Sequence, residues 1–212
     1  MRNALFAALA GLSFATPAFA GITVTDIELL YQDTLTINSP ISGSGYIGQQ
    51  VLTTSIGTID AWCIDLFHDD YIGGGQNLAF TTSATLTDGQ GNVLAPATVN
   101  EIAGLIAYGD AVLAGRQVAP PGNLNDFSAS IQLAIWTDEY AGFSYNGNAT
   151  LSAEVAHDLS KAANWSGPTT ALVSLNGGQG LVTADPVPEP VSMALLGTGL
   201  FGVGLVRSRT RG

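Results

Sequence analysis

The sequence predicts an α+β protein: a β-rich sandwich or barrel-like half with a three-helix insert, plus an N-terminal signal peptide and a single C-terminal transmembrane helix. Three observations support this prediction. Residues 21–95 are rich in β-branched side chains and alternate in part between apolar and polar. Residues 98–164 space their apolar side chains as helices do. Both ends of the chain combine an apolar run with arginine.

The charge and the cysteine content exclude several classes of protein. Of the 212 residues, 11% are charged and 46% are hydrophobic, which excludes disorder of the highly charged kind. Residues 21–188 contain sixteen acidic and two basic residues, a net charge of −14, which is the wrong sign for a nucleic-acid partner. The single cysteine excludes an internal disulfide framework and a cysteine-rich zinc site.

Residues 1–20 have the three parts of a secretory signal peptide. Arg2 supplies the positive start, Ala4–Phe14 is an apolar run, and Ala18–Ala20 is a small-residue cleavage site. We therefore expect signal peptidase to cut between Ala20 and Gly21, so that the mature protein is exported. An uncleaved N-terminal core helix or anchor is the alternative.

Residues 185–212 form a tail with three parts in a fixed order. Pro188, Glu189 and Pro190 come first, the apolar run Val191–Val206 follows, and three arginines end the chain. A helix of that length measures about 24 Å, slightly short of the ~30 Å hydrocarbon core. The arginines stop transfer and stay cytoplasmic, so we expect the helix to hold the precursor in the inner membrane.

This order of motif, apolar helix and arginine cluster resembles the PEP-CTERM sorting signal. The resemblance implies processing by exosortase, a membrane cysteine protease of Gram-negative bacteria that make exopolysaccharide. It implies a membrane-anchored precursor that ends at the cell surface or in the extracellular matrix, where adhesion and biofilm roles are expected. A plain membrane anchor is the alternative. The tail predicts a destination, so the activity must lie in residues 21–184, the predicted exported domain.

The first half of that domain is expected to form strands separated by glycine-rich turns. The predicted turns are Ile56-Gly57, Gly73–Gly75 and Asp88–Asn92. The predicted strands are Ile22–Tyr31, Thr34–Asn38, Tyr46–Ser55, Thr58–Phe67 and Leu78–Leu86.

The second half is expected to contain three helices and a closing strand or two within Thr169–Val182. A capping box at Thr98–Glu101 predicts the start of the first helix. Asp126 is the predicted cap of the second helix, and Asn148 or Thr150 is that of the third. The second and third helices are predicted at Phe127–Tyr140 and Leu151–Asn164.

A glutamine and the single cysteine stand out within these elements. At 100° per residue, Gln132 lies in the apolar stripe that also holds Trp136, with Ser130 and Thr137 on the opposite side. A buried glutamine amide is costly unless it is hydrogen-bonded or has reacted. Cys63 lies in a strongly apolar predicted strand. Ordinary burial in the core, with the amide bonded to the backbone, is one interpretation of both residues.

Together the two segments resemble the thioester domains of bacterial surface adhesins. Those domains carry an aromatic-Cys motif in their β part, matched here by Trp62-Cys63. They also carry Gln-x-Ala-apolar-Trp on a helix, matched by the Gln-Leu-Ala-Ile-Trp segment that begins at Gln132. The family usually has threonine before the glutamine, where this sequence has Ile131.

The resemblance implies that the Cys63 sulfur and the Gln132 side-chain carbonyl join as a thioester, with loss of ammonia. Trp62, Trp136 and Tyr140 would form the supporting pocket that excludes water. The protein would then capture a surface polymer or a protein ligand covalently. The alternative is a non-catalytic structural protein of the matrix or biofilm, with no thioester bond. Neither function makes the protein an enzyme, and we expect no cofactor.

Other candidate residues are weaker. Asp65, Asp69 and Asp70 are possible cation ligands, but a solvated acidic loop is the ordinary interpretation, so we expect no metal. His157 and Asp158 are expected on the exposed side of the third helix. The sequence contains no Gly-x-Ser-x-Gly elbow, no metalloprotease helix and no phosphate loop.

Overall fold

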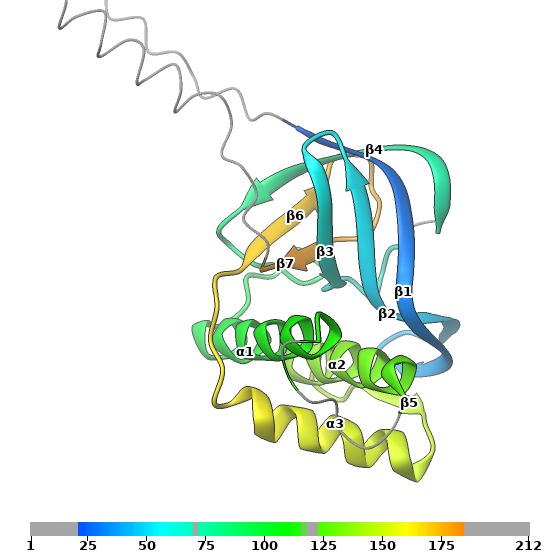
Figure 1. Cartoon of the computed structure of the whole chain (residues 1–212), viewed down its shortest axis with the longest axis vertical. Coiled ribbons are helices and arrows are strands. Elements are labelled where there is room, and N and C mark those ends of the chain that lie inside the picture. Colours follow the sequence, from blue (N-terminus) through cyan, green and yellow to red (C-terminus); the bar gives the residue numbers. More distant parts are fainter. Residues whose placement is uncertain (1–20, 70–71, 116, 118–122, 185–212) are drawn as a thin grey trace, which may run out of the picture. The chain divides into compact units, whose positions relative to one another are not determined.

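The strands close into an antiparallel barrel in a computed structural model that describes residues 21–69, 72–115, 117 and 123–184. Around the ring the strands follow the order β1, β2, β3, β7, β6, β4, and the ring closes because β1 pairs with both β2 and β4. β5 pairs with the far end of β1. The bounds are β1 Ile22–Ser39, β2 Gly43–Thr54, β3 Gly57–Cys63, β4 Gly73–Ser83, β5 Ser144–Asn146, β6 Thr170–Ser174 and β7 Leu181–Thr183. The prediction of a β-rich half with three helices is confirmed (Figure 1). Of the two predicted forms, sandwich and barrel, the strands adopt the barrel.

β1 is one continuous strand where the sequence predicted two, Ile22–Tyr31 and Thr34–Asn38. Its register against β2 shifts between Leu29 and Gln32, as it does at a β-bulge. Such irregularities bend a strand without ending it. One strand can therefore pair with β2, β4 and β5 along its length.

Two other strand boundaries were predicted wrongly. Gly73–Gly75 is not a turn: it opens β4, where Gly73 and Gly74 pair with β1. β3 ends at Cys63 instead of continuing to Phe67. The predicted turn at Asp88–Asn92 is confirmed, because the Asp88 amide donates to the Asn92 carbonyl at 3.0 Å.

The helices begin at caps that the sequence identified only in part. α1 (Pro96–Leu113) follows Ala95 without a side-chain cap, so the predicted capping box at Thr98 is wrong. Proline in the first turn favours the start of the helix instead, because its fixed φ suits that position. α2 (Leu124–Glu139) is capped by Asn123, not by Asp126. α3 (Ala149–Ala162) is capped by Asn148, one of the two predicted residues.

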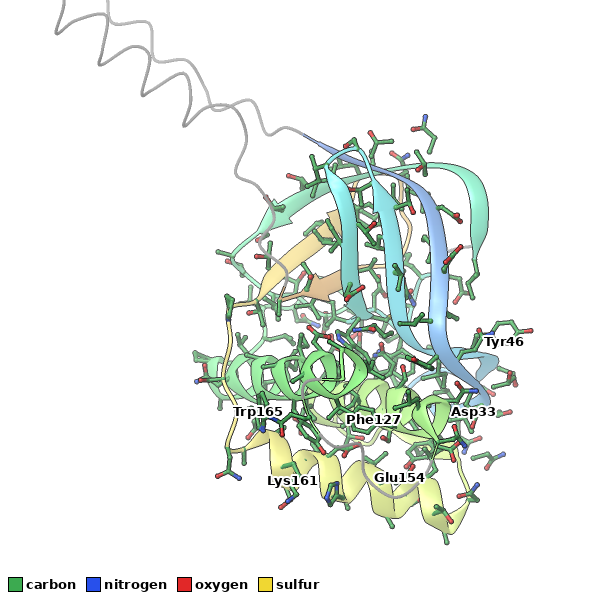
Figure 2. All side chains as sticks on the ribbon, in the orientation of Figure 1. Asp33, Tyr46, Phe127, Glu154, Lys161 and Trp165 are labelled. Carbon is green, nitrogen blue, oxygen red and sulfur yellow. The ribbon has the colours of Figure 1, made fainter. Side chains whose placement is uncertain are left out.

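The helices form layers against the barrel. α1 and α2 lie next to the strands in Figure 1, and α3 packs on the far side of both. α2 is therefore covered on all sides, and every residue from Phe127 to Trp136 is buried. Aromatic rings fill the space between the helices: Phe127 and Trp165 each lie 5.7 Å from the ring of Tyr108 (Figure 2).

This layering explains the burial of Ser130 and the wrong prediction that Asp158 is exposed. Ser130 is fully buried because α3 covers its side of α2, and its hydroxyl donates to Asp158 Oδ2 at 2.6 Å. Asp158 is likewise fully buried, whereas its neighbour His157 remains exposed. Periodicity within one helix shows which residues share a face, but it does not show how many faces are covered.

The predicted segments at the two ends lie outside the described residues. These are the signal peptide 1–20 and the helix Val191–Val206. Within the described part of the chain, no helix is long and apolar enough to cross a membrane.

Candidate functional site

The side chain of Gln132 lies directly on the backbone of Cys63. β2 pairs with β3 only as far as Gln50 and Ala61, so the β2-facing edge of β3 is open at Cys63. The Gln132 carboxamide, from α2, takes that position. Its Oε1 accepts from the Cys63 amide at 2.9 Å, and its Nε2 donates to the Cys63 carbonyl at 2.7 Å. The amide therefore replaces a neighbouring strand and fixes α2 against the end of β3.

The Cys63 thiol is buried beside this amide. The residue is 2% exposed and Gln132 is 1% exposed. The sulfur donates to the Asp65 carbonyl at 3.1 Å and accepts from the Asp65 amide at 3.2 Å. Burial raises the pKa of the thiol well above its usual value. The Asp65 backbone has the next largest effect and lowers the pKa, the charge of Glu139 raises it, and the Trp136 indole lowers it least.

A cavity of about 380 Å³ opens onto the pair. Cys63, Gln132 and Trp136 belong to its lining, and all three are buried. Tyr46 and Ile72 also line it and are largely exposed, so the cavity reaches the surface; Figure 2 shows Tyr46 projecting from the edge of the barrel. A small solute can therefore approach two groups that bulk water does not surround.

Tyr140 holds the segment that follows Cys63. Its hydroxyl donates to the Ile64 carbonyl at 3.1 Å and accepts from the amides of Gly89, at 3.1 Å, and Leu66, at 3.4 Å. Burial raises the pKa of this phenol, and the Glu139 charge adds to the effect. Tyr140 thus supports the position of Cys63 through the backbone and does not line the cavity.

Trp62 faces away from the pair. Its indole Nε1 donates to Asp110 Oδ1 at 3.0 Å, and the same oxygen accepts from Gln49 Nε2 at 2.8 Å. Neighbouring residues of a strand point to opposite faces, so Trp62 packs toward α1 while Cys63 faces the cavity. The prediction that Trp62 supports the pocket is therefore wrong, and Trp62 instead anchors β3 on α1.

The acidic residues after β3 serve different roles. Asp65 accepts from the amides of Phe67, His68 and Gly180, and its Oδ2 lies 2.8 Å from His68 Nδ1, so it organises the local turn. Asp69 is exposed and lines the cavity. Asp70 lies outside the described residues. No group of three metal-ligating side chains is present among the residues described.

Sequence analysis did not select two residues near the pair. Gln179 Nε2 donates to the Asp65 carbonyl at 3.1 Å, and its Oε1 accepts from Gln50 Nε2 at 2.9 Å. Glu139 is half-buried near the thiol with both carboxylate oxygens buried, and this burial, with the Asp88 charge, raises its pKa to about 9. Glu139 follows Trp136 by three residues and so shares the helical face of Gln132 and Trp136. This spacing in the sequence could have indicated that Glu139 lies near the pair.

Comparison with protein families explains the tail. Residues 186–209 match the PEP-CTERM protein-sorting motif. The chain carries a PEP-CTERM sorting motif. The prediction made from Pro188, Glu189 and Pro190 is thereby confirmed, although these residues lie outside the described part. The PEP-CTERM motif marks an exported, membrane-anchored precursor that exosortase processes.

Two further comparisons concern the whole chain. A search of curated proteins finds no match. Among solved structures, the chain is similar to the N-terminal thioester domain of fibronectin-binding protein SfbI from Streptococcus pyogenes. The two share 13% identity at a TM-score of 0.48, and the match covers 82% of this chain and 98% of that one.

Proposed function

We propose that this protein captures a partner at the cell surface through a thioester between Cys63 Sγ and Gln132 Cδ. The observation that carries the proposal is the docking of the Gln132 carboxamide on Cys63 itself, by two hydrogen bonds at the floor of an open cavity. Two contacts hold the amide carbon beside the backbone of the residue that carries the sulfur. This geometry supplies the proximity that an otherwise slow reaction requires.

The reaction balances without a cofactor. The thiol sulfur adds to the amide carbon, the C–N bond breaks, and the nitrogen leaves as ammonia with the thiol proton. During capture, an amine of the partner adds to the same carbon, the C–S bond breaks, and a proton from the amine restores the thiol. The partner is then joined to Gln132 by an amide bond, and each site acts once.

The Cys63 backbone amide supports the first of these steps. It donates to Gln132 Oε1 at 2.9 Å, the oxygen on which negative charge develops when the sulfur attacks. A buried backbone donor aimed at such an oxygen stabilises the charge more than water would. Burial also protects a completed thioester from hydrolysis, while the cavity leaves a path for the partner.

Amine incorporation tests this function. Purified exported protein is incubated with isotope-labelled methylamine, and free thiols are then alkylated. We expect one methylamine per chain at Gln132, together with one newly alkylated thiol at Cys63. Cys63→Ala and Gln132→Ala should incorporate none. The matched control is Gln50→Ala, which alters the lining of the same cavity without touching the pair. Incorporation that survives Cys63→Ala would contradict the mechanism.

We also propose the destination that the tail implies: the cell surface or extracellular matrix of a Gram-negative bacterium, with roles in adhesion and biofilm. The support is the match to the sorting motif at residues 186–209. The partner is a surface polymer or a protein. The −14 charge of residues 21–188 disfavours nucleic acid.

Processing at both ends is the corresponding prediction. Exported protein should begin at Gly21, because Ala18–Ala20 fits signal peptidase. The tail should be removed in a host with exosortase and retained in an otherwise identical host without it. Terminal sequencing and intact mass of the protein from both hosts measure the two cuts. Equal survival of the tail in both hosts would overturn the sorting assignment.

A further inference from the structure

One buried indole N–H has no partner, and it lies at the candidate site. Trp136 is 5% exposed, and its Nε1 is buried without a hydrogen bond. It is the only nitrogen among the unpartnered buried side-chain atoms of the described residues; the others are oxygens. Buried donors in native proteins are nearly always paired, so an orphaned one requires an explanation. By contrast, the Trp62 indole N–H is paired with Asp110.

Trp136 lines the same cavity as the reacting sulfur. Trp136 follows Gln132 by four residues on α2, so both side chains lie on the same face of the helix. Both line the cavity with Cys63. The Trp136 side chain lowers the pKa of the thiol, so the indole favours a charged sulfur over a neutral one. The neighbouring charges of Glu139 and Asp65 act in the opposite direction.

The indole N–H therefore makes no hydrogen bond while the thiol is neutral, and it stabilises a negatively charged sulfur. A hydrogen bond to an ionised acceptor is about twice as strong as one between neutral groups. Groups that interact more strongly with the transition state than with the ground state accelerate a reaction. Sulfur carries negative charge at one stage of the proposed chemistry, when the C–S bond breaks during capture.

We propose that the Trp136 indole N–H stabilises the departing Cys63 thiolate when a partner opens the thioester. This inference rests on the proposed function. The amine adds to Gln132 Cδ, the electron pair of the C–S bond goes to Sγ, and Nε1–H donates a hydrogen bond to Sγ without transferring its proton. The proton released by the amine then neutralises the sulfur. Trp136 therefore acts on the leaving group, while the Cys63 amide acts on the carbonyl oxygen.

Trp136→Phe tests this role because it keeps an aromatic ring and removes the N–H. The matched controls are Trp62→Phe, which removes a buried and paired N–H, and Trp165→Phe, which alters a ring in the helical layer. The rate of methylamine incorporation is measured on full exported protein whose thioester content has first been determined by mass. We expect Trp136→Phe to react at least about tenfold more slowly per thioester, in line with the loss of one such donor. The controls should stay near the wild-type rate.

A second readout separates this role from simple packing. The pKa of the Cys63 thiol is measured in the amine-opened protein from the pH dependence of alkylation. Loss of the donor should raise that pKa above the wild-type value. Looser packing would admit water and lower it. If Trp136→Phe does not fold, benzothienylalanine at position 136 keeps both fused rings and lacks the N–H.

The outcomes distinguish the two proposals. Wild-type protein that contains no thioester overturns the proposed function, and this inference with it. A thioester that opens as fast in Trp136→Phe as in wild type, or an unchanged or lowered thiol pKa, overturns the role of Trp136 alone.

Discussion

Gln132→Ala is expected to be less stable than Cys63→Ala by about 2–4 kcal/mol, although neither variant can form a thioester. Removing the carboxamide leaves the Cys63 amide and carbonyl unpaired in a buried strand end. Each unpaired buried group costs about 1–3 kcal/mol. Removing the thiol leaves both of these hydrogen bonds in place, so Cys63→Ala loses only packing and the two weak contacts of the sulfur with the Asp65 backbone.

Urea denaturation of the two variants at one pH measures this difference. Because both lack the covalent link, the comparison isolates the backbone pairing from the bond itself. Equal stability of the two variants would show that Gln132 does not replace a strand at the edge of β3. The proposed chemistry would then lose the contact that positions the amide carbon.

The second large effect is on pH dependence: the free energy of unfolding should fall as the pH rises from 5 to 8. Burial raises the pKa of Glu139 to about 9 and that of Asp138 to about 6, with the Asp88 and Glu101 charges as the next causes. The folded state therefore keeps protons that the unfolded chain releases above about pH 4. Stability is highest at low pH and is lost until Glu139 itself ionises near pH 9.

A single group of this kind changes stability by up to about 1.4 kcal/mol per pH unit. We expect a total loss of about 4–5 kcal/mol between pH 5 and pH 8, about 4 of it from Glu139, measured by denaturation at several pH values. Glu139→Gln should flatten most of the slope, and Asp138→Asn only the part near pH 6. The exposed Glu28→Gln is the control. Stability that stays constant or rises with pH would contradict the buried neutral state of Glu139.

The burial of the site could be predicted from sequence, but its contacts could not. Helical periodicity placed Gln132 in an apolar stripe, and it is 1% exposed. That its amide would meet the Cys63 backbone depends on where β2 leaves β3, beyond Ala61. This register is set by pairings between distant segments, which no local pattern reports. The prediction for Trp62 was wrong for a related reason: alternation along a strand does not show which face of the strand meets which helix.

The barrel itself shows the same division. Strand content and turn residues predicted most elements of the first half, including the turn at Asp88–Asn92. Closure depends on β1 pairing on both sides while its register shifts, and the two three-residue strands, β5 and β7, take their pairing from neighbours. Strands that short carry too few residues for an alternating pattern. The start of α1 was also predicted wrongly: the sequence suggested a side-chain cap at Thr98, but the helix begins with a proline and has no side-chain cap.

The most direct test of the thioester is the intact mass of the exported protein, prepared gently and without amines. If Cys63 and Gln132 are joined, the protein is lighter than its processed sequence by one ammonia, and Cys63 resists alkylation until methylamine is added. Cys63→Ala and Gln132→Ala should each show their full sequence mass. A wild-type protein of full sequence mass, with Cys63 freely alkylated after unfolding in amine-free buffer, would contradict covalent capture. Gln132 would then be a hydrogen-bonded core amide that completes the edge of β3.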